Sequence, residues 1–114
     1  MTTREAITRA DELRPNCISA EQKVAWLREL DAEFAELMGM ELPENKWPED
    51  QPLLMPEPYD GCYVNHLCVK IDLGNQETEA YANDMVIRNA SVREAKAWYR
   101  RNNKPRYRGN WRVM

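Results

Sequence analysis

Residues 56–75, PEPYDGCYVNHLCVKIDLGN, have the features of a buried helix around which the other segments are arranged. Pro56 and Pro58 are expected near its start, because proline's missing N–H has no partner to lose in the first helical turn. Gly74 and Asn75 are expected to end it, because both tolerate the left-handed conformation. The apolar residues recur at helical spacing and predict one broad buried face: Tyr63, Val64, Leu67, Cys68 and Ile71.

Two further helices are predicted before this segment. Thr2 followed by Glu5, and Ser19 followed by Gln22, are capping-box patterns, and an apolar face of helical period follows each of them. A Pro-Asn pair ends the first of these helices, and Gly39 is a typical residue to follow the second.

The rest of the chain completes a four-helix pattern. Residues 77–102 have no internal Gly or Pro and predict a long fourth helix, which Pro105 ends. Residues 40–57 contain four prolines and predict a long loop rather than a helix. We therefore expect an all-α, four-helix bundle-like domain over residues 1–103, with this proline-rich loop between the second and third helices and a basic, aromatic tail over residues 104–114.

Large apolar side chains in the loop and near the C-terminus are candidates for contacts with another subunit or protein, because interfaces use such anchors. The candidates are Trp47, Leu53, Leu54, Met55, Trp98 and Trp111. The alternative is that the loop packs on its own domain and that Trp98 belongs to the core.

Charge is distributed unevenly along the sequence. Residues 88–114 hold nine basic residues and one acid, a net +8, whereas residues 1–87 hold seven basic and eighteen acidic residues, a net −11. Such a dipole suits contact with a polyanion, or head-to-tail packing in which an acidic face meets a neighbour's basic face. Six basic residues are candidates for contact with DNA or a partner: Arg100, Arg101, Lys104, Arg106, Arg108 and Arg112. Three explanations of this basic charge remain open: a position close to DNA, docking to another protein, and a tail that has no binding role.

The sequence favours neither a metal site nor an enzyme. Cys62 and His66 share a helix face, but Cys68 is turned about 200° away from His66 at 100° per residue. A nucleophilic pair would have to use the single histidine, and neither a phosphate-binding loop nor a paired-carboxylate signature occurs. We expect no cofactor, no metal and no catalytic residues.

The remaining expectations concern location and redox state. No apolar run approaches the roughly 20 residues of a membrane span, and the N-terminus lacks the apolar stretch of a signal peptide. We therefore expect no membrane contact and a cytoplasmic location. Three cysteines, an odd number, favour free thiols over a disulfide framework.

The pattern PxPYDxxYxxxLxxKIDxxNxExxxYxNxM, which runs from Pro56 to Met85, resembles small head-tail connector, or adaptor, proteins of tailed bacteriophages and prophages. The segments TTREAITRADELRPN, EQKVAWLRELDAEF and AKAWYRRNNKP resemble the same group, so the resemblance covers nearly the whole chain. Gly61 and Cys62 depart from it, where a larger pair is expected, and the tail is longer and more basic.

The resemblance implies a mostly helical subunit that forms a homo-oligomeric ring beneath the portal and receives the tail. It implies portal and tail proteins as partners, DNA in the channel as a further contact, and a location in the virion after assembly in the host cytoplasm. The alternative, which rests on charge alone, is a small nucleic-acid-binding or regulatory protein that uses the basic C-terminal helix and tail.

Overall fold

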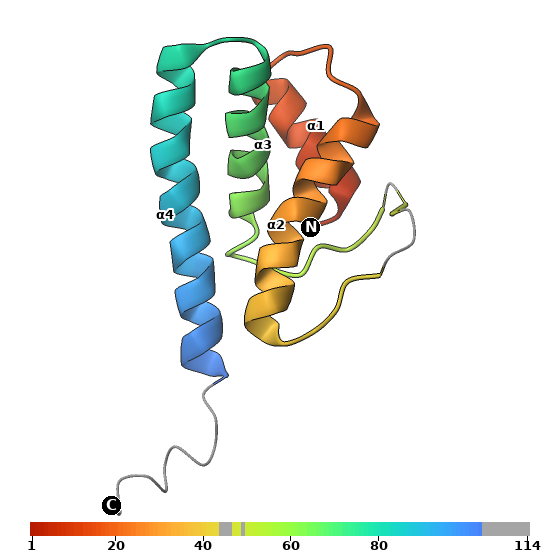
Figure 1. The fold of residues 1–114 in the computed structure, drawn as a ribbon, viewed down its shortest axis with the longest axis vertical. Helices are drawn as coiled ribbons and strands as arrows, with labels where there is room; N and C mark the ends of the chain where they lie inside the picture. Colours follow the sequence, from red (N-terminus) through yellow and green to blue (C-terminus); the bar gives the residue numbers. More distant parts are fainter. Residues whose placement is uncertain (44–46, 49, 104–114) are drawn as a thin grey trace, which may run out of the picture.

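The computed structural model describes residues 1–43, 47, 48 and 50–103, and over these residues the fold is all-α. Its helices are α1 (Thr3–Leu13), α2 (Ala20–Met38), α3 (Gly61–Gly74) and α4 (Thr78–Asn102). Helix α3 lies between α4 on one side and the α1–α2 pair on the other (Figure 1). The predicted four-helix, all-α class and the central position of the third helix are therefore confirmed.

Local capping signals in the sequence are accurate. The Thr2 hydroxyl accepts from the backbone N–H of Glu5, whose side chain accepts from the Thr2 N–H, so the predicted capping box begins α1. Ser19 caps α2 by accepting from the Gln22 N–H at 3.2 Å. Gly39 follows α2 in the left-handed conformation, with φ of 70°.

The predicted start of the central helix is wrong, whereas its end lies at Gly74 and Asn75 as predicted, although without the left-handed conformation there. Helix α3 begins at Gly61 rather than at the prolines, because residues 57–60 form a turn in which the Tyr59 N–H donates to the Pro56 carbonyl at 2.9 Å. A residue that precedes proline disfavours the helical conformation, and Glu57 stands before Pro58. At the other end, the left-handed residue is Gln76, with φ of 59°.

Gly74 is the last residue of α3 and serves packing rather than a left-handed turn. A Cβ atom at this position would lie 3.2 Å from the Cδ1 atom of Ile18, in the segment that joins α1 to α2. The small residue therefore lets that segment approach α3 closely. Asn75 follows with φ of −88°, which is ordinary right-handed backbone.

The core contains the predicted stripe of α3. Tyr63, Leu67 and Ile71 are fully buried, and the Phe34 ring of α2 meets the Tyr63 ring edge to face, with centroids 5.9 Å apart. The exposed face of the central helix is small because α1, α2 and α4 all pack against it.

The proline-rich loop is held to the domain by a buried polar network. The Tyr63 hydroxyl donates to Asp31 Oδ1 at 2.5 Å and accepts from the Met55 N–H at 2.8 Å. Asp31 Oδ2 accepts from the Leu54 N–H at 3.2 Å. Burial raises the pKa of Asp31 to about 6, although both hydrogen bonds oppose the shift. One tyrosine and one carboxylate thus join α2, α3 and the loop.

A second charged cluster joins three helices at the opposite end of α3. Arg14, which follows α1, donates to Asp72 of α3 at 3.1 Å and to Asp84 of α4 at 2.8 Å. The Asp72 side chain is 1% exposed. Burial, followed by the neighbouring Asp84 carboxyl, raises the pKa of Asp72 to about 6, and Arg14 opposes that shift.

Candidate functional site

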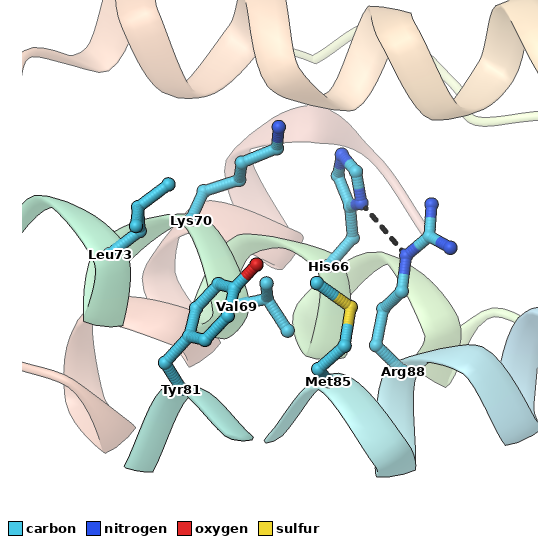
Figure 2. A pocket seen from close by; sticks show the side chains of 7 residues that line it. All are labelled: His66, Val69, Lys70, Leu73, Tyr81, Met85 and Arg88. Atoms are coloured by element: carbon cyan, nitrogen blue, oxygen red, sulfur yellow. Dashed lines mark hydrogen bonds between the residues drawn. The ribbon is translucent and has the colours of Figure 1, made fainter. Parts of the chain in front are cut away.

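A cleft of about 230 Å³ opens between α3 and α4, on the side that faces α2. Figure 2 shows the side chains that line it, with His66 and Arg88 joined by a hydrogen bond at one end. The lining residues are His66, Val69, Lys70, Leu73, Tyr81, Met85 and Arg88. Helical spacing explains the set, because His66, Lys70 and Leu73 recur at intervals of four and three residues on one face of α3.

Cations in and beside the cleft pair with two carboxylates of α2. Arg88 lies 3.3 Å from Glu33, Lys96 also lies 3.3 Å from Glu33, and Lys70 lies 3.8 Å from Glu29. The two lining cations keep part of their side chains in water, with 29% of Lys70 and 18% of Arg88 exposed. The cleft is therefore a joint at which ion pairs connect α3 and α4 to α2.

His66 is buried and neutral at physiological pH. Burial, and then the nearby Arg88 and Lys70 cations, lower the pKa of His66 to about 4, while the Trp26 backbone and Glu33 oppose the shift. Its Nδ1 accepts from Arg88 Nε at 3.3 Å, which assigns the imidazole proton to Nε2. In this state His66 orients Arg88 and is a poor proton acceptor.

The His66→Gln variant should lose less stability in acid than the unsubstituted protein. The pKa of His66 is about 4 in the folded protein, whereas its ordinary value, which applies to the unfolded chain, is 6.5. As the pH drops from about 6.5 to 4, the unfolded chain therefore binds a proton that the folded protein does not, and stability falls. At pH 4 this loss amounts to up to about 3 kcal/mol. Urea denaturation at pH 7 and pH 4 measures the free energy of unfolding of both proteins. Between these pH values the variant should gain about that amount relative to the unsubstituted protein. A difference between the two proteins that is the same at both pH values would contradict the lowered pKa of His66.

The two cysteines of α3 are packing residues. Cys62 and Cys68 are buried, and burial raises the pKa of Cys62 to about 12 and that of Cys68 to about 11. Their thiols are therefore protonated at neutral pH. Within residues 1–43, 47, 48 and 50–103, no three His, Cys, Asp or Glu side chains are grouped so that they could hold a metal ion.

The candidate interface residues separate into two groups. Trp47, Leu53 and Met55 are 6%, 8% and 0% exposed and pack in the core of their own subunit. Their side chains are thus covered without a partner. This fits the alternative stated from the sequence, in which the loop packs on its own domain. Leu54 and Trp98 are only partly buried, and the Trp98 ring stacks on Tyr59 with centroids 5.1 Å apart. Trp111 lies outside the described residues.

The basic candidates are only partly described. Arg100 and Arg101 are exposed in the last turn of α4, where cations also favour the negative end of the helix dipole. Lys104, Arg106, Arg108 and Arg112 lie outside the described residues.

Sequence reasoning did not identify the cleft. The pairing of Arg88 with His66 and Glu33 joins residues 22 and 55 positions apart. A cation within an apolar stripe, together with a histidine on the central helix, was the available signal. It indicated a buried polar contact but not its partners.

Comparison with family models, with curated proteins and with solved structures finds no match to this chain. In the part of the chain that the structure describes, none of the helices has the length and hydrophobicity needed to cross a membrane.

Proposed function

We propose that this protein is a non-enzymatic structural subunit of a tailed-bacteriophage or prophage virion. In this role it is a head-tail connector, or adaptor, that forms a ring between the portal and the tail during virion assembly. Support comes from the ordered resemblance of nearly the whole chain, and above all from residues 56–85. The subunit is made in the host cytoplasm and becomes part of the virion.

The observation that carries the proposal is the exposed apolar surface of α4. This helix packs mainly against α3 and leaves Val86 and Ile87 70% and 53% exposed. Large apolar side chains on an edge helix are typical of a protein that functions by contact with other subunits. The partners proposed are further copies of the same chain, the portal and a tail protein, with DNA passing close to the exposed Arg100 and Arg101.

The experiment is sedimentation of the purified full chain over a wide concentration range, alone and with portal protein. We expect the mass to rise with concentration and to reach one closed oligomer, with portal shifting assembly to lower concentration because binding stabilises the assembled state. A monomer under all of these conditions would contradict the ring.

The rival function is nucleic-acid binding through the basic end of α4 and the residues after it, and Arg93, Arg100 and Arg101 are the exposed described cations that favour it. DNA-binding measurements on the same samples distinguish this rival from the ring. Duplex DNA binding that weakens steeply with salt, and that is lost when residues after Asn103 are removed, supports the rival. Ring formation without measurable DNA binding at low salt eliminates it.

A further inference from the structure

One side of α4 carries a continuous exposed seam. Val86, Ala90, Arg93, Ala97 and Arg100 recur at alternating intervals of four and three residues, which places them in one row along the helix. All are exposed except Ala97, which is half-buried, and Val86 is 70% exposed. The row combines small residues, which allow a second helix to approach closely, with arginines that can pair across a contact.

A complementary groove lies along α2. It has a volume of about 720 Å³ and runs between α2 and the loop segment that contains Trp47 and Pro48. Ala20, Val24 and Ala25 give its α2 wall a mainly apolar surface. Trp47 lines the groove, and its Nε1–H is buried without an acceptor among the described residues.

The groove and the seam lie on opposite sides of the subunit. Glu33 of α2 pairs with Arg88 and Lys96 of α4, so this side of α2 faces α4 within the subunit. Arg28 lines the groove, and five residues of helix place it about 140° around α2 from Glu33. In Figure 1, α4 forms one edge of the molecule and the loop beside α2 forms the other. Contact between seam and groove must therefore join two copies.

The charges of the two surfaces are opposite. Glu21 lines the groove, and the exposed Glu36 and Glu41 line the hollow that continues from it towards the end of α2. The seam side of α4 instead exposes Arg93 and Arg100, with Arg101 and one acid, Glu94, beside them. The one lining cation, Arg28, is engaged within its own subunit, where its guanidinium lies 5.6 Å from the centre of the Trp47 ring and donates to the Pro43 carbonyl.

We propose that the α4 seam of one subunit docks in the α2 groove of the next copy. The inference rests on the proposed ring and identifies the two surfaces that form it. The contact is head-to-tail, since the seam and the groove are different surfaces, and such a contact generates a ring when its rotation closes. Ala25 and Ala32 on α2, and Ala90 and Ala97 on α4, are each seven residues apart, so two close-approach points occur at matching intervals.

Paired cysteines test the contact in the full chain. The exposed Cys17 is first replaced by serine, which leaves the buried Cys62 and Cys68. Separate proteins that carry Ala25→Cys or Ala97→Cys are mixed at ring-forming concentration and oxidised with a copper–phenanthroline catalyst and dissolved oxygen, and the pairing is repeated with Ala90→Cys. The exposed Thr8→Cys on α1 is the matched control.

We expect a mixed dimer of the α2 and α4 variants in at least tenfold excess over any dimer with the Thr8→Cys control. Rings that form without this mixed product, or that give only α4-to-α4 dimers, overturn the inference and leave the ring function intact. A chain that stays monomeric in sedimentation overturns both. If DNA protects the α4 cysteines from oxidation and no ring forms, the seam binds nucleic acid, and this result also overturns the inference.

Discussion

Replacing Arg14 with methionine should lower the free energy of unfolding by about 3 kcal/mol at pH 7.5. The change keeps much of the side-chain volume but leaves the buried Asp72 and the nearby Asp84 without their cation. Breaking a fully buried ion pair costs about 3–5 kcal/mol. Because Arg14 is itself 35% exposed, we expect the lower end of that range. Urea denaturation followed by circular dichroism measures the loss.

The loss should depend on pH in a defined direction. The pKa of Asp72 is already raised to about 6, and removal of Arg14 raises it further, so the folded variant holds a proton over a wider range than the unfolded chain. Stability of the variant is then lost as the pH rises through that higher pKa. The deficit should be small near pH 5 and largest above pH 7. Arg9→Met, an exposed position on α1, is the matched control, and an equal loss in both variants would contradict the role of the cluster.

Features that depend on neighbours in sequence could be predicted, and those that depend on distant partners could not. The Thr2 capping box and the left-handed Gly39 involve residues within one helical turn, so their patterns carry the information. The predicted start of α3 was wrong because proline has two opposing effects on helix formation. Pro56 suits a first helical turn, but Pro58 restricts Glu57 and delays the helix to Gly61.

The polar networks illustrate the second case. Asp31 and Tyr63 are 32 residues apart, and Arg14 and Asp84 are 70 residues apart. The spacing of Asp31, four residues after Leu27 and three before Phe34, places it on the apolar face of α2 but does not identify Tyr63 as its partner. The pairing follows from how α2 packs on α3. Periodicity predicts which face of a helix is buried, but not which residues of two packed helices meet.

The same limit applies to the candidate contact residues. Trp47 and Met55 were candidates because large apolar side chains stand out in a proline-rich loop, but composition cannot distinguish a core anchor from an interface anchor. Val86 and Ile87 of α4 are instead exposed, together with Leu13, Met40 and Leu73. Of the predicted contact residues that the structure describes, Leu54 and Trp98 are partly buried and Arg100 and Arg101 are exposed, and their contact role stays a prediction.

Several residues of the family-like pattern hold the subunit together. Tyr59 stacks on Trp98, Tyr63 binds Asp31, and Asp72 binds Arg14. The surfaces proposed to contact other subunits lie outside these residues, on the outer sides of α2 and α4.

Replacing Tyr63 with phenylalanine should cost about 3 kcal/mol at pH 7.5, which lowers the melting temperature by more than about 10 °C for a domain of this size. The ring is retained, but Asp31 loses its short hydrogen bond and the Met55 N–H loses its buried acceptor. Removal of the hydroxyl also raises the pKa of Asp31 above its present value of about 6, so the deficit should shrink near pH 5, where the carboxyl is protonated in both proteins.

The matched control for this variant is Tyr59→Phe, which should stay within about 0.5 kcal/mol because the Tyr59 ring is only half-buried and its stacking on Trp98 is preserved. Limited proteolysis adds a local readout. Because the Tyr63 hydroxyl fastens the loop at Met55, the Tyr63→Phe variant should be cleaved faster within residues 50–57 than the control, even at temperatures where both remain helical. Equal cleavage of the two variants, or a deficit that does not change between pH 5 and 7.5, would show that the Asp31–Tyr63 network does not fasten the loop.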